Sequence, residues 1–234
     1  MIRNSLLILL LAGLGWILFQ EFDSFKGSDQ LNPVAEYYAT QGPQEVGAAN
    51  LVTSVVVTYR GLDTLGEVTI LFLTAAIVGL LFKRESESEN DDIFGTSEIL
   101  LTAGKILVPM LILVGVYIFI NGHLTPGGGF QGGAVLASAL VLAALTFSDV
   151  SVKHKVLEIV ESFSGISFVL LGILGIILAG GFLDNRIFSL GTFGHLFSAG
   201  AIPIIYSLVG LKVGAELSNI VLTMKSPQKG GDHV

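Results

Sequence analysis

A glycine-rich stretch at residues 121–133 separates two long apolar runs and limits what this chain can fold into. It reads Asn-Gly-His-Leu-Thr-Pro-Gly-Gly-Gly-Phe-Gln-Gly-Gly, with six glycines and one proline, so no regular helix is expected to continue through it. In lipid an unpaired backbone amide costs several kcal/mol, and irregular backbone is tolerated only where protein or water satisfies it. The stretch therefore predicts a re-entrant or closely packed element, buried among the helices of a larger assembly.

The composition is that of an integral membrane protein. Hydrophobic residues make up 52% of the 234 and charged residues 13%, which is about half the charged fraction of an ordinary soluble domain. The chain has no cysteine, which excludes disulfides, thiolate metal sites and cysteine nucleophiles. Its net charge of −7 comes mostly from the segments between the apolar runs, and nothing in the pattern indicates a nucleic-acid partner.

Six apolar runs approach the roughly 20 residues that a spanning helix needs. They cover 4–20, 65–82, 98–120, 131–147, 158–180 and 194–223, which predicts an all-α, polytopic membrane protein. Residues 1–20 resemble a secretory signal, but no small-x-small cleavage site follows, so we expect a retained first span. The apolar segment 47–60 is too short to span and is expected to form an interfacial helix before the second span.

The charges in the loops predict the orientation and the domain boundaries. Seven cations fall on one side of the predicted topology and three on the other, which by the positive-inside rule predicts that both termini are cytoplasmic. The expected location is the cell membrane. A charged stretch at 85–97 is expected to be a cytoplasmic linker between a two-span module at 1–84 and a four-span domain at 98–224, with a polar cytoplasmic tail at 225–234. The seven cations are Arg3, Lys83, Arg84, Lys153, Lys155, Lys225 and Lys229, and the three are Lys26, Arg60 and Arg186.

Two motifs carry a family resemblance. The stretch at 121–133 resembles the hallmark of the MnhB/MrpB subunit of the Mrp-type multisubunit cation/proton antiporters, and this resemblance covers about 93–224. Upstream, residues 59–67 read Tyr-Arg-Gly-Leu-Asp-Thr-Leu-Gly-Glu. They are similar to a signature found in the MbhE-type subunit of energy-converting hydrogenases and at the C-terminal end of some MrpA subunits. The chain therefore resembles a fusion of two neighbouring subunits.

The resemblance implies a complex that exchanges Na⁺ for H⁺ across the membrane, with other antiporter-like membrane subunits as partners. In that family the large subunits carry most of the proton conduction, and the MnhB/MrpB subunit is required for activity. The chain would contribute to assembly and, as a hypothesis, to the ion path. Dinucleotide and phosphate-loop patterns are absent, so neither a cofactor nor enzymatic turnover by this chain alone is expected.

Three alternatives remain open at this point. The same module could serve in the membrane arm of a redox-driven ion pump of the membrane-bound hydrogenase type, with a redox module as a partner. It could also be a purely structural subunit that carries no ion. The weakest alternative is an autonomous small transporter with a midplane site at the broken segment.

Ionisable residues inside predicted spans are costly in lipid and are therefore candidates for function. Glu67 lies near the start of the second span, with Asp63 four residues and Arg60 seven residues before it, so the three share one helix face. A carboxylate pair beside a cation suits a proton or Na⁺ relay. The competing interpretation is a helix start, with Asp63 or Thr64 as N-cap and Glu67 completing a capping box.

Three more ionisable residues belong to predicted spans. Lys105 lies about seven residues into the third span, where it either snorkels to the cytoplasmic face or pairs with a carboxylate such as Glu216. Lys212 and Glu216 are four residues apart near the predicted cytoplasmic end of the last span, where pairing neutralises both. The alternative is that this cluster lines an ion path.

His123 and His195 are predicted near the outer membrane surface, where an imidazole could relay protons. A structural role is favoured for both, with His123 holding the glycine-rich stretch by a hydrogen bond and His195 at the entry of a span. Two histidines without further ligands predict no metal site. For the glycines we favour close helix packing over an anion-binding nest. The structural motif comprises Pro126, Gly127, Gly128, Gly129, Phe130, Gly132 and Gly133.

Overall fold

The computed structural model describes residues 2–24, 30–82, 97–147 and 154–225, and within these ranges all regular structure is helical. Six of the helices are long and apolar enough to cross a membrane, which confirms the predicted all-α polytopic fold. The chain divides into two compact units, Met1–Tyr37 and Tyr38–Val234. The predicted linker at 85–97 lies outside the described residues except for Ser97, and so does the predicted tail beyond Lys225.

The first unit contains α1 (Ile2–Ser24) and the start of α2 (Pro33–Val46). The apolar part of α1, Asn4–Phe22, coincides with the predicted first span, and its side chains are exposed. The start of α2 is capped by Asn32, whose Oδ1 accepts a 2.8 Å hydrogen bond from the backbone N–H of Ala35.

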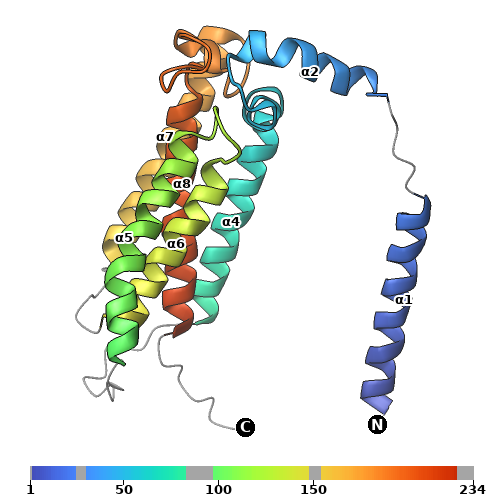
Figure 1. The fold of residues 1–234 in the computed structure, drawn as a ribbon, viewed down its shortest axis with the longest axis vertical. Coiled ribbons are helices and arrows are strands. Elements are labelled where there is room, and N and C mark those ends of the chain that lie inside the picture. Colours follow the sequence, from blue (N-terminus) through green and yellow to red (C-terminus); the bar gives the residue numbers. More distant parts are fainter. Residues whose placement is uncertain (1, 25–29, 83–96, 148–153, 226–234) are drawn as a thin grey trace. The chain divides into compact units, whose positions relative to one another are not determined.

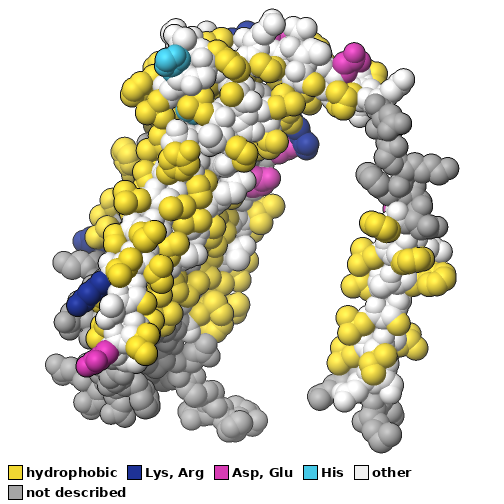
Figure 2. Space-filling model, in the orientation of Figure 1, with side chains coloured by type: hydrophobic (Ala, Val, Ile, Leu, Met, Phe, Trp, Pro, Cys, Tyr) yellow, Lys and Arg dark blue, Asp and Glu magenta, His cyan; other side chains and the backbone are white. Residues whose placement is uncertain are grey.

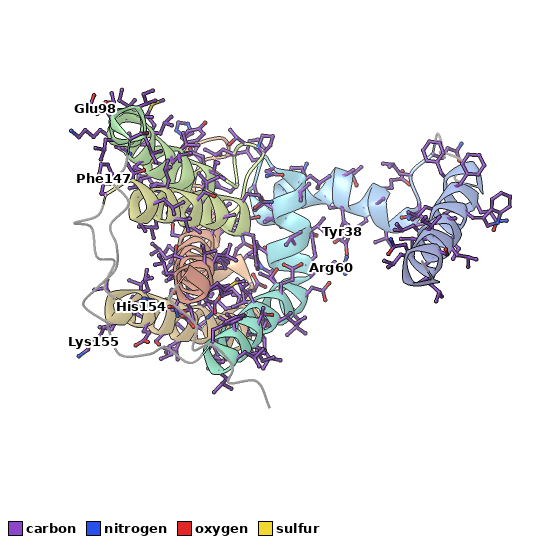
Figure 3. All side chains as sticks on the ribbon, turned by 90° about the horizontal axis from the view of Figure 1, so that it is seen from below. Tyr38, Arg60, Glu98, Phe147, His154 and Lys155 are labelled. Atoms are coloured by element: carbon purple, nitrogen blue, oxygen red, sulfur yellow. The ribbon has the colours of Figure 1, made fainter. Side chains whose placement is uncertain are left out.

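Five long helices of the second unit form a bundle (Figure 1). α8 lies at its centre, where it contacts the other four helices and is the most buried of the spans. Figure 3 views the bundle from the end where α5 and α7 begin, at Glu98 and His154, and shows α8 surrounded by its neighbours. The five helices are α4 (Gly61–Leu81), α5 (Glu98–Ile120), α6 (Gly129–Thr146), α7 (His154–Ala179) and α8 (Ile202–Lys225).

Glycines let α6 pack backbone to backbone against two neighbours. A Cβ placed on Gly132 would lie 2.7 Å from the carbonyl oxygen of Gly115 on α5. A Cβ on Gly133 would lie 2.7 Å from the carbonyl oxygen of Gly210 on α8. Contacts this short leave no room for any side chain, so the glycines set the separation of the three helices.

The break between α5 and α6 is shorter than the sequence predicts. α5 ends at Ile120, a turn occupies 121–128, and α6 already begins at Gly129, so the last three glycines of the motif are helical. Glycine inside a helix costs about 1 kcal/mol relative to alanine, and here the close packing against α5 and α8 offsets that cost. Gly128, at φ 154°, takes the backbone conformation that favours glycine and reverses the chain into α6.

The last span begins later than predicted, at Ile202 rather than at residue 194. Residues 188–201 are apolar in part but form a loop, preceded by a short 3₁₀ helix, η2 (Asn185–Ile187). His195 therefore lies in this loop rather than at the entry of a span, and it is exposed.

The predicted interfacial helix at 47–60 is irregular. It consists of a single turn, α3 (Leu51–Thr53), followed by a π-helical segment, η1 (Ser54–Tyr59), that leads into α4 at Gly61. The helix α2 before it is not predicted, because it has no long apolar run and contains Pro43, which usually ends a helix.

Candidate functional site

Three segments meet at one end of the bundle, which we call the loop end: residues 46–60, 121–128 and 180–201 (Figure 1). Asn50 ties the first to the second. Its backbone N–H donates a 3.0 Å hydrogen bond to the carbonyl of His123, and its side-chain Nδ2 donates to the carbonyls of Gly122 and Thr125 at 2.8 and 3.0 Å. The same side chain caps α3 through its Oδ1, which accepts from the N–H of Val52. One residue therefore fixes the turn between α5 and α6.

Two further buried side chains complete this connection. The Thr53 hydroxyl donates to the carbonyl of Gly122 at 2.6 Å and accepts from the hydroxyl of Tyr206 on α8 at 3.0 Å. Asn185 donates to the carbonyls of Val46 and Ala199 at 2.7 and 3.0 Å. Because buried polar groups are costly without partners, these bonds hold segments far apart in the sequence in one arrangement.

His123 lies fully buried within this network. Its Nε2 is 3.4 Å from the carbonyl oxygen of His195, and its Nδ1 has no partner among the described residues. Burial lowers the pKa of the imidazole, and the nearby backbone at His195, Ile120 and Leu196 opposes that shift only in part. The histidine is thus held in its neutral form and packs as part of the turn.

The carboxylates at the start of α4 lie on the outside of the bundle. Asp63 forms an ion pair with Arg60, and the side chains of both are more than half exposed. Glu67 is exposed one turn further along and forms no ion pair among the described residues. Figure 2 shows acidic and basic side chains interrupting the otherwise apolar surface. The structure therefore places the three residues on one helix face without joining the two carboxylates.

The alternative capping role of these residues is wrong. α4 begins at Gly61, three residues earlier than a cap at Asp63 requires and four earlier than a cap at Thr64 requires, and no side chain caps its first turn. The Thr64 hydroxyl instead donates to the carbonyl of Val56 in η1 at 2.8 Å, so it satisfies a carbonyl of the π-helical segment.

Lys105 and Glu216, which the sequence offers as partners, are not paired. Lys105 is exposed on α5, whereas Glu216 is fully buried on α8 and forms a 2.5 Å ion pair with Lys212. The Lys212–Glu216 pair lies in the middle of α8, at its eleventh and fifteenth residues of 24, because the helix begins only at Ile202. This corrects the predicted position near the cytoplasmic end.

The described residues contain no group of three or more acidic or imidazole side chains that could hold a metal ion. A family model described as a domain related to the MnhB subunit of Na⁺/H⁺ antiporter matches residues 99–219, more than half of the chain. The chain belongs to this MnhB family. A second family model, described as the MbhE subunit of MBH, matches residues 3–93. The predicted fusion of an MnhB-type domain with an MbhE-like segment is therefore confirmed.

Proteins similar to this MnhB-family chain occur in two kinds of complex. It is 33% identical over 102 residues to the B-type subunit of the Na⁺/H⁺ antiporter of Bacillus subtilis, covering 42% of this chain and 66% of that protein. It is 40% identical to a chain in the structure of the membrane-bound sulfane sulfur reductase (MBS), an archaeal respiratory membrane complex, with TM-score 0.78 and coverage of 97% and 100%. A chain in the Mrp complex from Dietzia sp. shares the fold at TM-score 0.76 and 22% identity, over 99% of this chain and 27% of that one.

Several residues that the MnhB-family bundle brings together could not be recognised from the sequence. Asn50, Thr53 and Asn185 are single polar residues without a motif, and only long-range packing shows their partners. Glu161 on α7 is another such residue, although it interacts electrostatically with Lys212. Glu161 lies four residues before Gly165, which packs against Lys212, and only the structure shows this contact.

Proposed function

We propose that this chain is a membrane subunit of an Mrp-type complex that exchanges Na⁺ for H⁺, with other antiporter-like membrane subunits as its partners. The observation that carries the proposal is the joining of the MnhB-type domain and the MbhE-type segment at the loop end, through Asn50 and Thr53. Within the second unit, parts that match two different family models are thus held together. The similarity to the Na⁺/H⁺ antiporter protein of Bacillus subtilis supports the ion chemistry.

The outer face of α4 supports a role within a larger assembly. Asp63 and Glu67 are exposed on a helix long and apolar enough to span the membrane, and a charged side chain facing lipid is strongly disfavoured. Exposed Leu62, Ile70 and Leu73 flank these carboxylates. A partner subunit that offers an apolar helix and a cation or a water-filled cavity would satisfy this face.

The same face supports a contribution to the ion path. Arg60 pairs with Asp63, whereas Glu67 has no ion partner among the described residues and remains available to a proton or to Na⁺ at the subunit boundary. The expected role of Glu67 is to pass an ion between this chain and its neighbour. The proposal gives no part in the partner contact or in the ion path to Lys105, which is exposed on α5, or to His123, which is buried at the loop end.

Glu67→Gln in the purified complex tests the ion-path role. After reconstitution into vesicles, with proton movement followed by a pH-sensitive dye, we expect the variant to assemble normally and to lose Na⁺-dependent proton exchange. Glu98→Gln, at the exposed start of α5, is the matched control and should exchange at the wild-type rate. Full exchange by Glu67→Gln would instead favour the purely structural role.

A second candidate function has its own support. The match to the membrane-bound sulfane sulfur reductase chain extends over 97% of this chain at 40% identity, which favours a place in the membrane arm of a redox-driven complex. The proposed role of the chain in assembly and in the ion path is the same there, and only the source of energy for ion transport differs. In both settings we expect ion transport rather than an enzymatic reaction by this chain itself.

The proposal includes a location and an orientation. Six spanning helices give a multi-pass membrane protein, and we propose the cell membrane with both termini in the cytoplasm. Of the ten cations used for this orientation, three have described side chains: Arg60 and Arg186 at the loop end, each paired with an aspartate, and Lys155, exposed at the opposite end. The cations at the loop end are thus neutralised, whereas Lys155 remains unneutralised by any described residue.

A further inference from the structure

The centre of the bundle contains a buried group of charged side chains on α7 and α8. Lys212 and Glu216 on α8 form a 2.5 Å ion pair and are 8% and 0% exposed. The stem of Lys212 lies against Gly165 of α7, where an added Cβ would meet it at 3.5 Å. Its Nζ lies 5.2 Å from the centre of the Phe72 ring of α4, within the range of a cation–π contact. The ammonium is therefore held in place from three helices.

A second, half-buried carboxylate lies within electrostatic range of the same lysine. Glu161, one turn before Gly165 on α7, interacts electrostatically with both Lys212 and Glu216. The group then holds two carboxylates and one ammonium, a net charge of −1 if all three were ionised. Inside a membrane-spanning bundle an uncompensated charge is expensive, and such groups neutralise by taking up a proton.

The geometry also shows where the proton would bind. The Oε1 atom of Glu216 accepts from Lys212, but the Oε2 atom is buried and has no partner among the described residues. An unpartnered, fully buried carboxylate oxygen is costly as an anion and becomes a donor when protonated. A metal cation is a poor occupant, because the ammonium of Lys212 repels it and only two carboxylates are present.

We propose that Glu161, Lys212 and Glu216 form a proton-binding site at the centre of the membrane-spanning bundle, which holds one exchangeable proton. A proton taken from water converts one carboxylate of the group to a carboxylic acid, and the reverse step returns it. The other carboxylate remains the counter-ion of Lys212. This proposal rests on the proposed function, since it assigns the proton of that exchange to a site in this chain.

Polar side chains lie beyond the site toward one end of the bundle, and buried apolar side chains lie toward the other. Toward the end where α7 begins, Glu158 lies one turn from Glu161, and His154 lies 2.9 Å from Oδ1 of Asn219 on α8. The contact of His154 with Asn219 lies at the boundary between α7 and α8, and Glu158 is exposed. In the other direction the boundary is closed by the buried apolar side chains of Phe168 and Val209.

Other titratable groups of the packed helices do not face the site. On α4, Asp63 and Glu67 are exposed near the loop end, and on α5, Glu98 and Lys105 are exposed. The helix α6 contains no acidic, basic or histidine residue. The protonation of the group is therefore determined by its own three members, with Glu158 and His154 toward the end where α7 begins.

Infrared difference spectroscopy of the purified complex between two pH values tests the proposal. In the wild type we expect the C=O band of a buried carboxylic acid, shifted in D₂O, whose intensity titrates with pH. Glu216→Gln and Glu161→Gln should each abolish the titrating band, because the remaining carboxylate stays ionised beside Lys212. Glu98→Gln, at the exposed start of α5 and not facing the site, is the matched control and should retain it.

A third variant keeps the test decisive if either glutamine variant fails to assemble. Lys212→Met removes the ammonium that keeps one carboxylate ionised, so the carboxylic acid band should grow at the same pH. Absence of the band in the wild type would overturn the proposal, as would its survival in both glutamine variants. Loss of the band on adding Na⁺ at constant pH would also overturn it, because the site would then bind the metal ion.

The vesicle assay separates this proposal from the proposed function. A titrating band that depends on Glu161 and Glu216, in a complex without Na⁺/H⁺ exchange, would retain the proton site and contradict the antiporter function. Exchange in a complex without such a band would retain the function and overturn the site. The two results are independent, because the band reports protonation and the dye reports transport.

Discussion

The side-chain amide of Asn50 donates a 2.8 Å hydrogen bond to the carbonyl of Gly122, 72 residues further along the chain. This bond joins the MbhE-type segment, matched over residues 3–93, to the first glycine of the motif in the MnhB-type domain. The connection joins the MnhB-type domain to the portion of the MbhE-type segment that belongs to the second unit.

We expect Asn50→Ala to destabilise the protein by about 1–3 kcal/mol, since it leaves two carbonyls of the turn without their donor. Thermal unfolding of the detergent-solubilised chain measures the change. Asn32→Ala is the matched control, because it removes only an exposed helix cap in the first unit. An equal decrease in unfolding temperature in the two variants would contradict the conclusion that Asn50 holds the loop end together.

Alanine at the buried helical glycines should also destabilise the bundle. In Gly132→Ala the new methyl group would lie 2.7 Å from the carbonyl of Gly115, so the helices must separate, at a cost of about 1–3 kcal/mol. Gly79→Ala on α4 has open space around the added methyl and should be neutral or stabilising by up to about 1 kcal/mol, because alanine favours the helix. The ratio of folded to unfolded protein in a denaturant series measures both, and a neutral Gly132→Ala would refute the close packing.

The stability of the loop end should fall in acid. The pKa of His123 is lowered in the folded state relative to 6.5, mainly by burial. The unfolded chain therefore binds a proton first as the pH falls below 6.5, so the stability that is present above this pH is lost progressively as the pH falls toward the folded-state pKa.

Unfolding temperatures measured across this range should show the decrease in the wild type and a weaker one in His123→Gln. His195→Gln, at an exposed position, should behave as the wild type does. A pH dependence that is the same in all three proteins would assign the effect to other groups.

The absence of cysteine makes the orientation directly measurable. Thr192→Cys at the loop end and Lys155→Cys at the opposite end both place a thiol at an exposed position. We expect a membrane-impermeant maleimide to label Thr192→Cys in intact cells, and to label Lys155→Cys only after the cells are opened. The reverse pattern would invert the proposed topology, and the cysteine-free wild type reports background labelling.

The sequence predicted the long helices well where polar residues flank an apolar run at both ends. The third span was expected at 98–120, and α5 occupies those residues. The last span was misplaced because Phe193, Leu196 and Phe197 extend the apolar run backward into a loop. The better signal was Pro203, which lies in the first turn of α8, where its missing N–H costs nothing.

The candidate site was less predictable for a physical reason. The charge and position of Glu67 can be read from one helix, whereas the neighbours of Glu216 depend on how α7 and α8 are aligned. Shifting one helix by a single residue would rotate Glu161 by about 100° away from Lys212. Contacts between elements distant in the sequence, such as Asn50 with Gly122, are likewise fixed only by the assembled bundle.

The central claim is that this chain works as one part of an ion-transporting membrane complex. Purification of the tagged chain in mild detergent, with mass spectrometry of everything that accompanies it, tests that claim most directly. We predict recovery of large antiporter-like membrane subunits, alone in a secondary antiporter or together with redox proteins in a redox-driven complex. Recovery of the chain by itself, folded and monodisperse, would contradict the account and favour an autonomous transporter.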